Sequence, residues 1–334
     1  MKKAALTLKD IADQLGISPA TVSLALRNKE CVAEKTRQMV WEAAKRSGYV
    51  YNRSAARLRT QRSTTIGLIV PTLLNPFFTE LTSAVEEKLD SFGYSLLLAK
   101  TSEDRNRQGK ALRTMLEYSV DGILLCPALG TTQEDLRICE KANTPLVLFT
   151  RPVDGARVDY VGPENGAGTS MAARYLLGKG HERIAFIGGT PGSFTRWERF
   201  EGYRKALEDA HVPVNPSYTK TCESTLDGGF QAIQELLMLE DRPSAAVCFN
   251  DVIAFGVILG LWAHRILPGK EFGVIGFDNL SDAALFSPAL TTLSCPPRRI
   301  GHQASELLLE RIEHPERKPV TNILVPELIL RDSA

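Results

Sequence analysis

The stretch LKDIADQLGISPATVSLAL (residues 8–26) determines the fold of the N-terminal part of the chain. Apolar side chains recur at helical spacing through its first half, at Leu8, Ile11, Ala12 and Leu15. Thr7 can cap this helix, and Gly16 can turn the chain after it. Ser18 can cap a second short helix in which Pro19 takes the first position, where a missing N–H group costs nothing. The stretch therefore predicts two short helices joined by a tight turn.

The residues that follow predict a third helix, from about Glu34 to Ser47, which can end at Gly48. The apolar residues expected to form a common core are Val22, Leu26, Val40, Ala43 and Ala44. The order helix, glycine turn, serine-capped helix, helix is typical of a helix-turn-helix. The second helix of that motif can enter the major groove of DNA while the first braces the backbone. An unrelated three-helix bundle would show the same spacing.

The charge of the chain is uneven. Residues 1–62 hold 13 Lys/Arg and 5 Asp/Glu, a net charge of +8, whereas the rest holds 27 and 34, a net charge of −7. A basic head on an acidic body indicates a nucleic-acid-binding module joined to a second function, although a solvated basic surface would give the same numbers. Within the head, NRSAARLRTQR (52–62) holds four arginines and no acid, and could be a flexible linker or a short helix.

The composition is that of a globular protein, with 43% hydrophobic and 24% charged residues. A length of 334 residues indicates two or three domains. No apolar run approaches the roughly 20 residues of a membrane helix, and MKKAALTLKD (1–10) lacks the apolar segment of a signal peptide. We therefore expect a cytoplasmic protein without membrane contact. The six cysteines are widely scattered and include no C-x-x-C pair, so neither a zinc site nor a disulfide framework is expected. No cofactor is expected either.

From Thr65 onward, β-rich apolar runs alternate with helical stretches. Seven runs predict buried strands: IGLIV (66–70), SLLLA (95–99), GILLC (122–126), PLVLF (145–149), RIAFI (183–187), SAAVCF (244–249) and FGVIGF (272–277). The helical stretches include 77–92, 165–178, 197–210 and 251–264. This alternation predicts parallel sheets covered by helices on both faces, and the number of units predicts two lobes. Ligands of such sheets bind beyond the carboxyl ends of strands, where FIGGTPGS (186–193), FND (249–251) and GFDN (276–279) fall.

The N-terminal stretch (8–26) resembles the helix-turn-helix signature of lac-repressor-type (LacI/GalR) transcriptional regulators. The resemblance continues through VAEKTRQMVWEAAKRSGYVYNRSAARLR (32–59). It then covers most of the remaining chain, at IGLIVPTLLNPFF (66–78), VDGILL (120–125), GHERIAFIGG (180–189), RFEGYRKAL (199–207), FNDVIAFG (249–256), GVIGFDN (273–279) and PALTTL (288–293). Several independent motifs in the family's order make the match specific.

The resemblance implies an all-α helix-turn-helix headpiece (1–48), a hinge helix or linker (49–63) and a two-lobed α/β sensor domain (64–334). The sensor domain should be similar to periplasmic sugar-binding proteins. The segments expected in the two lobes are about 64–163 with 294–322, and about 164–291 with 323–334. The resemblance further implies a homodimer, a pseudo-palindromic double-stranded operator, and a small-molecule effector between the lobes, a sugar or sugar derivative.

By the same resemblance, several headpiece residues match positions that touch phosphates or base edges: Thr7, Leu8, Ser18, Thr21, Ser23 and Arg27. Pro19, Ala20 and Leu24 match the positions that vary with operator sequence, and none of the three is a strong hydrogen-bond donor. Base reading would then rely on apolar contacts, for example to thymine methyl groups. Leu24 could instead belong to the headpiece core.

The segment from Asn52 to Thr60 matches the family's hinge helix, which folds when paired with its mate over a widened minor groove. Leu58 matches the leucine that is inserted between the central base pairs, and Ala55 matches its small neighbour. Arg59 could reach phosphates or the floor of the groove. A basic helix of this length is marginal without DNA, so its folding could act as the switch.

In the sensor domain, Arg199 matches the family's ligand-gripping arginine, whose fixed donors suit hydroxyl, carboxylate or phosphate oxygens. Asp278 matches an aspartate that accepts hydrogen bonds from ligand hydroxyls, and Asn250 matches a pocket amide. Phe77 and Phe78 could supply an apolar wall. As alternatives, Asp278 and Asn250 could cap helices, and the two phenylalanines could belong to the core.

Two positions depart from the pattern of sugar-binding members. Thr150, followed by Arg151, stands at the end of a strand where an aspartate is common, and Cys295 stands where some members have a polar amide. Thr150 is retained as a candidate effector-binding residue. Without the aspartate, a sugar phosphate, a sugar acid or a larger saccharide is an alternative to a simple neutral sugar. A degenerate cavity without a ligand is a further alternative.

These features predict a sequence-specific DNA-binding transcriptional regulator, a repressor controlled by its effector. A solute-binding protein for transport would share the two lobes, but the basic head and the missing signal peptide argue against it. An enzyme is not expected. FIGGTPGS lacks the spacing of phosphate-binding glycine loops, no two histidines stand four residues apart, and no G-x-S-x-G motif occurs.

Overall fold

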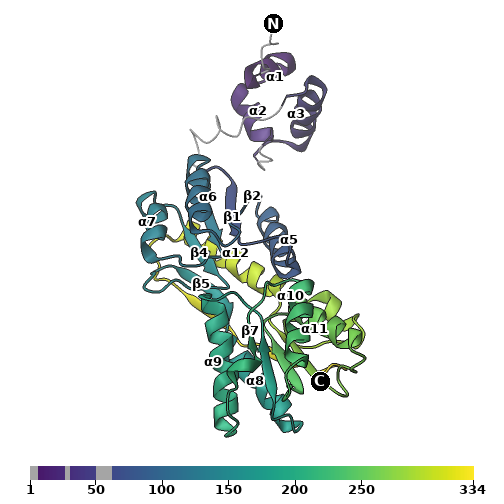
Figure 1. The fold of residues 1–334 in the computed structure, drawn as a ribbon. Coiled ribbons are helices and arrows are strands. Elements are labelled where there is room, and N and C mark those ends of the chain that lie inside the picture. The colour runs from purple at the N-terminus through teal and green to yellow at the C-terminus, as the bar shows by residue number, and fades with distance from the viewer. Residues whose placement is uncertain (1–6, 27–30, 50–61) are drawn as a thin grey trace. The chain divides into compact units, whose positions relative to one another are not determined.

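The computed structural model describes residues 7–26, 31–49 and 62–334, which fall into two compact units, Met1–Ser63 and Thr64–Ala334 (Figure 1). The described part of the first unit, the headpiece, contains the helices α1 (Leu8–Leu15), α2 (Pro19–Leu26) and α3 (Glu34–Ser47). The bounds predicted for the third helix are confirmed, because Gly48 follows it in the left-handed conformation, with a φ of 69°.

The caps that the sequence predicts are present in the headpiece. Thr7 and Asp10 form a capping box, in which the Asp10 amide donates to the Thr7 hydroxyl at 3.3 Å. Gly16 ends α1 with a φ of 66°, and the Ser18 hydroxyl accepts from the Thr21 amide at 3.0 Å. The helices bury a small common core, formed by Ile11, Ala12, Val22, Ala25, Leu26, Val32, Val40, Ala43 and Ala44.

The second unit is built on two six-stranded sheets, called sheet A and sheet B. Sheet A contains, in spatial order, β11 (Thr321–Leu324), β5 (Asp159–Pro163), β4 (Leu146–Phe149), β3 (Gly122–Leu125), β1 (Thr65–Val70) and β2 (Ser95–Lys100). Sheet B contains β12 (Glu327–Ile329), β10 (Thr291–Ser294), β9 (Gly273–Asp278), β8 (Ala245–Cys248), β6 (Ile184–Ile187) and β7 (Thr219–Lys220). All neighbours pair in parallel except β10 and β12. The seven strands predicted from apolar runs are all present.

Helices cover both faces of the sheets (Figure 1). The helices of the sheet A lobe are α5 (Pro76–Asp90), α6 (Arg105–Glu117), α7 (Gln133–Lys141) and α12 (Pro297–Glu313). Those of the sheet B lobe are α8 (Asn165–Gly178), α9 (Phe194–Asp209), α10 (Leu226–Leu237) and α11 (Asp251–Ala263), with the 3-10 turns η1 (Pro216–Tyr218) and η2 (Ser281–Ala284). Throughout the described ranges, no helix combines the length and the apolar character needed to cross a membrane.

The chain passes between the two sheets after β5, after β10 and after β11. The second and third crossings lie two or three residues later than the sequence suggested. The reason is that β10 pairs with β9 as far as Ser294, and β11 pairs with β5 as far as Leu324. Each lobe is therefore assembled from segments that lie far apart in the sequence.

The run SLLLA (95–99) forms the predicted strand, but the prediction that it is buried is wrong. It lies in β2, which is the edge strand of sheet A and pairs with β1. Its side chains are exposed or partly exposed, and Leu98 is 39% exposed. An edge strand has one neighbour instead of two, so its apolar residues keep contact with solvent even in a parallel sheet.

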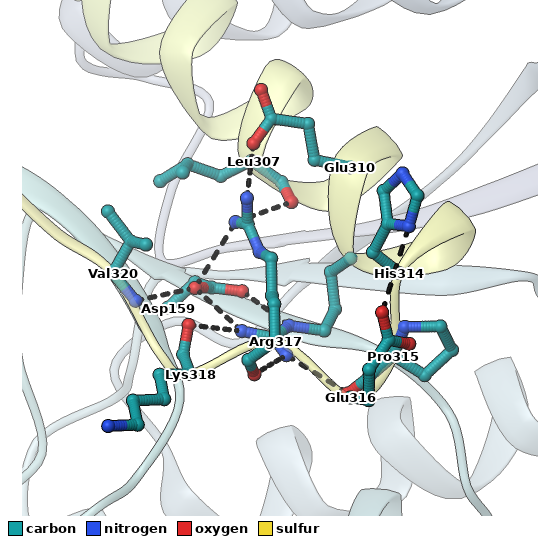
Figure 2. Close-up of polar contacts among 10 residues, drawn as sticks. Asp159, Leu307, Glu310, His314, Pro315, Glu316, Arg317, Lys318 and Val320 are labelled. Atoms are coloured by element: carbon teal, nitrogen blue, oxygen red, sulfur yellow. Dashed lines mark hydrogen bonds and ion pairs between the residues drawn. The ribbon is translucent and has the colours of Figure 1, made fainter.

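A charged cluster attaches the end of α12 to sheet A (Figure 2). The side chain of Asp159, on β5, is completely buried. Its carboxylate accepts from Arg311 Nε at 2.9 Å, from Arg311 Nη2 at 3.1 Å and from the Val320 amide at 2.8 Å. Arg317 donates to the same carboxylate at 3.4 Å and also pairs with Glu310. Four donors therefore saturate one buried carboxylate and hold the loop between α12 and β11.

Candidate functional site

One cavity in the second unit collects the residues predicted to bind an effector. This inter-sheet cavity has a volume of about 430 Å³ and is lined by residues at or just beyond the ends of strands from both sheets. All six predicted residues line it, namely Phe77, Phe78, Thr150, Arg199, Asn250 and Asp278. The cavity thus lies beyond the carboxyl ends of parallel strands, where this kind of fold favours ligand binding.

Arg199 lies on α9 and is 6% exposed. Its Nε donates to the side-chain oxygen of Asn165 at 2.8 Å, and its Nη1 donates to the Phe249 carbonyl. The guanidinium carbon lies 3.5 Å from the centre of the Phe277 ring and 4.7 Å from the centre of the Phe249 ring. These contacts fix the guanidinium in one orientation and leave Nη2 for Asp278, whose Oδ1 lies 3.9 Å away.

Asp278 is the last residue of β9 and is buried in the same place. Its φ of 116° is a conformation that costs energy for a residue with a side chain and that is often found at functional sites. None of the residues in the described ranges donates a hydrogen bond to its carboxylate, and its ion-pair partner is Arg199. Burial raises the pKa of Asp278 to about 7, with Arg199 lowering it and Glu80 raising it. Such a carboxylate is an acceptor for the hydroxyl groups of a small molecule.

Phe77, Phe78 and Asn250 each fit both roles that the sequence suggested, a structural role and a place in the wall of the cavity. Phe77 and Phe78, in the first turn of α5, belong to the hydrophobic core and also line the cavity, with ring centres 5.2 Å apart. Asn250 caps α11, because its side-chain oxygen accepts from the Ile253 amide at 3.1 Å. Within the described ranges its amide nitrogen has no partner, and this donor is what Asn250 can offer to a ligand.

The position where an aspartate was expected carries a different arrangement. The Thr150 hydroxyl lies 2.9 Å from the Cys126 sulfur. Arg151 pairs with both carboxylate oxygens of Glu103, at 2.7 and 2.8 Å, and donates to the Pro127 carbonyl at 3.1 Å. This side of the cavity therefore presents a hydroxyl and a neutralised ion pair instead of a single carboxylate.

Several lining residues were missed by the sequence reasoning. Thr195 lies one turn before Arg199 on α9, is buried, and has a hydroxyl without a hydrogen-bond partner among the described residues. Its spacing of four residues from Arg199 was a usable signal, because such residues share one helix face. Lys100 and Glu223, at the end of β2 and just after β7, gave no comparable signal. Cys295 is buried and does not line the cavity.

The predicted DNA-contact residues of the headpiece differ in exposure. The exposed ones are Thr7, Ser18, Pro19 and Ala20, and the partly exposed ones are Leu8, Thr21 and Leu24. Ser23 is 6% exposed and presents little surface to DNA. Leu24 also packs against the headpiece core, as its alternative assignment proposed. The remaining predicted contacts, Arg27, Asn52, Ala55, Leu58 and Arg59, lie outside the described residues.

Two protein families match the chain. The family described as "Bacterial regulatory proteins, lacI family" matches residues 7–52, and "Periplasmic binding proteins and sugar binding domain of LacI family" matches residues 63–329. The HTH-type transcriptional repressor PurR of Aliivibrio fischeri (strain MJ11) is 33% identical over 331 residues, which cover 98% of each chain.

Two solved structures are similar over most of the chain. The cellobiose complex of the transcriptional regulator CelR is 28% identical, covers 98% of this chain and 100% of its own, and gives a TM-score of 0.72. A LacI family transcriptional regulator from Enterococcus faecium with bound ribose is 26% identical, covers 81% and 98%, and gives a TM-score of 0.72. The chain therefore belongs to the LacI family of bacterial regulatory proteins, and is a transcriptional repressor with a helix-turn-helix headpiece and a periplasmic-binding-protein-like effector domain rather than an enzyme.

Proposed function

We propose that this repressor binds a pseudo-palindromic operator as a homodimer, and that a sugar or sugar derivative in the inter-sheet cavity controls its affinity for DNA. The observation that carries the proposal is the placement of Arg199 beside Asp278 in that cavity. Arg199 supplies fixed donors, and Asp278 supplies a buried acceptor that no described residue saturates. Together they suit neighbouring hydroxyl groups, because each hydroxyl both donates and accepts a hydrogen bond.

The other groups around the cavity fit a ligand with several hydroxyls. Thr150 and Thr195 contribute hydroxyl groups, and Asn250 contributes an amide. Phe77 and Phe78 add an apolar wall. Ligand sites commonly combine aromatic surface with a few polar groups in this way, since the apolar wall supplies binding energy and the polar groups supply specificity.

The similar proteins support a sugar as the effector. The CelR structure contains cellobiose, and the Enterococcus faecium structure contains ribose. The name of the Aliivibrio fischeri relative, PurR, mentions no sugar, so this relative does not add support for a sugar. A nucleobase is the competing class, because Phe77 and Phe78 could also pack against a flat heterocycle.

A surface around α11 supports the homodimer. Four large apolar side chains are exposed on or beside this helix, namely Leu226, Leu259, Trp262 and Leu285. They are neighbours, because Gly256 of α11 lies against the Leu226 carbonyl, and Phe255 stacks on Phe286, next to Leu285, with ring centres 4.5 Å apart. Exposed apolar residues gathered around one helix are typical of a surface that a second copy covers.

Selection of DNA from a random library with the full-length chain tests operator binding. We expect a pseudo-palindrome, because a two-fold symmetric dimer presents two equivalent headpieces. With about 6–10 phosphate contacts, affinity should fall by about 10³–10⁵-fold between 50 and 200 mM salt. Selection of an asymmetric site, or affinity that does not respond to salt, would contradict the proposal.

A thermal-shift screen of sugars, sugar phosphates, sugar acids and nucleobases, followed by DNA titration, tests the effector. A genuine effector should change operator affinity in the wild type but not in Arg199→Ala or Asp278→Ala, and operator DNA should change effector affinity by the same factor. Asp282→Asn, which alters an exposed aspartate near Asp278, is the matched control. A compound that acts equally on wild type and both variants contradicts the cavity assignment. If nothing in the panel acts, a cavity without an effector is the better account.

Light scattering of the full-length chain at micromolar concentration tests the homodimer. Leu259→Glu places a charge in the apolar surface around α11 and should produce monomers, because a buried unpaired charge destabilises an interface. Tyr118→Glu alters a residue that is 68% exposed in the other lobe and should leave the dimer intact. A wild-type monomer, or a dimer that survives Leu259→Glu, would count against this surface.

A further inference from the structure

A second cavity adjoins the inter-sheet cavity. This outer chamber has a volume of about 600 Å³ and is lined by residues 127–131, residues 151–155, Gly192 and Phe194. The first two segments follow β3 and β4 of sheet A, and the last two residues lie where α9 follows β6 of sheet B. None of the six residues predicted to bind an effector lines the outer chamber.

The two cavities adjoin each other along two walls. Arg151 lines both of them. The segment after β4 supplies Thr150 to the inter-sheet cavity and Pro152 to the outer chamber. The first turn of α9 likewise supplies Thr195 to the inter-sheet cavity and Phe194 to the outer chamber. A ligand that extends past Arg151 would therefore reach the outer chamber.

The outer chamber combines aromatic surface with available hydrogen-bonding groups. Phe194, which lines the chamber, is 44% exposed. Trp197, one turn further along α9, is 57% exposed and lies beside Phe194, with ring centres 5.6 Å apart, but is not itself a lining residue. The Asp154 carboxylate has no hydrogen bond or ion pair to any residue of the described ranges. At Gly130 and Gly192 a side chain would meet open space, so these loops present their main-chain groups to the chamber.

The charges of the outer chamber suit a neutral ligand. Arg151, the cation among its lining residues, already bonds to both oxygens of Glu103 and to the Pro127 carbonyl. The charge left over is that of Asp154, which repels a phosphate or a carboxylate. A sugar ring, by contrast, can lay an apolar face on an aromatic ring and donate its hydroxyls to carboxylate and carbonyl oxygens.

We infer that the effector contains at least two sugar units. The first lies against the Arg199–Asp278 pair in the inter-sheet cavity, and the second lies in the outer chamber, packed on Phe194 with Trp197 at its edge. The inference rests on the proposed function, since it describes the same ligand in more detail. It makes Phe194, Trp197 and Asp154 determinants of ligand length, separate from the pair that holds the first unit.

Calorimetric titration of the full-length protein tests this inference. The probes are neutral mono-, di- and trisaccharides of glucose, galactose, mannose and xylose, together with glucose 6-phosphate. We expect one disaccharide to bind about five- to tenfold more tightly than its monosaccharide, the size of a contact with one aromatic face. Phe194→Ala and Trp197→Ala should lose this gain and keep the monosaccharide affinity, whereas Trp197→Phe should keep both. Phe92→Ala, at an exposed phenylalanine that lines neither cavity, is the matched control.

Tryptophan fluorescence provides a second measurement. The chain has three tryptophans, Trp41, Trp197 and Trp262, and Trp197 is the one whose ring lies beside Phe194 of the outer chamber. The disaccharide should shift the emission of the wild type and protect it from a soluble quencher, because a sugar ring would cover the exposed indole. The monosaccharide should leave the emission unchanged, and Trp197→Phe should bind the disaccharide without a spectral response.

The outcomes separate this inference from the proposed function. If a monosaccharide or glucose 6-phosphate binds as tightly as the best oligomer, or if the α9 variants weaken mono- and disaccharide equally, the second sugar unit is ruled out. The proposed function survives that result when Asp278→Ala still abolishes binding. If no saccharide binds, the second sugar unit is ruled out and the wider effector screen decides the proposed function. If a saccharide binds but Asp278→Ala has no effect on its binding, the placement of the effector in the inter-sheet cavity is overturned as well.

Discussion

Two buried aspartates of the second unit, Asp159 and Asp278, each lie near arginine, but their surroundings differ. Asp159 accepts from four donors, on Arg311, Arg317 and the Val320 amide, all within 3.4 Å (Figure 2). Asp278 accepts from no residue in the described part of the chain, and its arginine lies 3.9 Å away. The comparison separates a carboxylate whose bonding capacity is used within the protein from one whose capacity no described residue uses.

The reason for the difference lies in the arginines. Arg311 directs Nε and Nη2 at Asp159, in the two-pronged geometry that binds a carboxylate best. Arg199 directs Nε and Nη1 at Asn165 and the Phe249 carbonyl instead, so only its remaining edge approaches Asp278. Burial therefore dominates at Asp278 and raises its pKa to about 7 despite the nearby cation. The two buried aspartate–arginine pairs thus differ in the number of hydrogen bonds that the arginine donates to the carboxylate.

The largest expected effect is on stability. Asp159→Ala leaves the largely buried guanidiniums of Arg311 and Arg317 without their carboxylate and should lower the free energy of unfolding by about 3–5 kcal/mol. Asp278→Ala removes a carboxylate that no described donor stabilises and whose ionised form burial disfavours, so it should not lower the free energy of unfolding and should raise it above about pH 7. Urea denaturation of both variants measures the contrast. Equal losses would show that the two aspartates are both structural.

The next effect concerns regulation. In the wild type, the effector should change operator affinity by about 5–150-fold, the usual range of coupling between two sites. Asp278→Asn preserves the shape of the side chain but loses its charge, and should reduce this change to less than about twofold. Fluorescence anisotropy of labelled operator, with and without effector, measures the response, and Asp282→Asn should retain it in full. A normal response in Asp278→Asn would mean that another group accepts the hydrogen bonds of the ligand.

The pH dependence of effector binding is a smaller effect with a defined sign. Burial raises the pKa of Asp278 from 3.8 to about 7, and its ionised form is the better acceptor. Lowering the pH from 8 to 6 should therefore weaken effector binding by about tenfold.

The stability of the protein without effector should follow the opposite trend. Below a pH of about 7 native Asp278 holds a proton that the unfolded chain releases above its ordinary pKa of 3.8, so the free energy of unfolding should fall as the pH rises between these values. Asp278→Asn should flatten both profiles. An unaltered profile of effector affinity in this variant, measured by calorimetry, would assign the titration to another group.

The smallest expected effect is at Thr195. Its buried hydroxyl has no partner among the described residues, so Thr195→Val should raise the free energy of unfolding by about 1 kcal/mol. Because the same hydroxyl lines the inter-sheet cavity, effector affinity should fall by about two- to tenfold. Thr150→Val is the comparison, since the Thr150 hydroxyl already lies 2.9 Å from the Cys126 sulfur and its loss should bring no such gain in stability. A loss of stability in Thr195→Val would show that its hydroxyl has a structural role.

Short-range sequence patterns, namely helix caps and runs of apolar residues, predicted most of the helices and the buried strands. The third headpiece helix has the predicted bounds, and α9 was expected at 197 but begins at Phe194, because the Ser193 cap was overlooked. The strand β5 was missed because it contains a charged residue and ends at Pro163, and β11 was missed because its side chains are mostly exposed. The family resemblance located six lining residues of the cavity, but it did not identify Thr195 or Glu103, whose importance depends on what they contact.

The sequence by itself determined the helix-turn-helix, the alternation of strands and helices, and the family, because periodicity and capping depend on residues a few positions apart. The tertiary structure alone decided which charged groups are satisfied. Asp159 and Arg311 are 152 residues apart, and Glu103 and Arg151 are 48 residues apart, and they meet because distant strands end side by side. The hydrogen-bonding partner of such a side chain is therefore set by which distant segments the fold brings together. Whether a buried carboxylate is bonded within the protein or has no donor among the described residues therefore cannot be deduced from the residue and its neighbours in sequence.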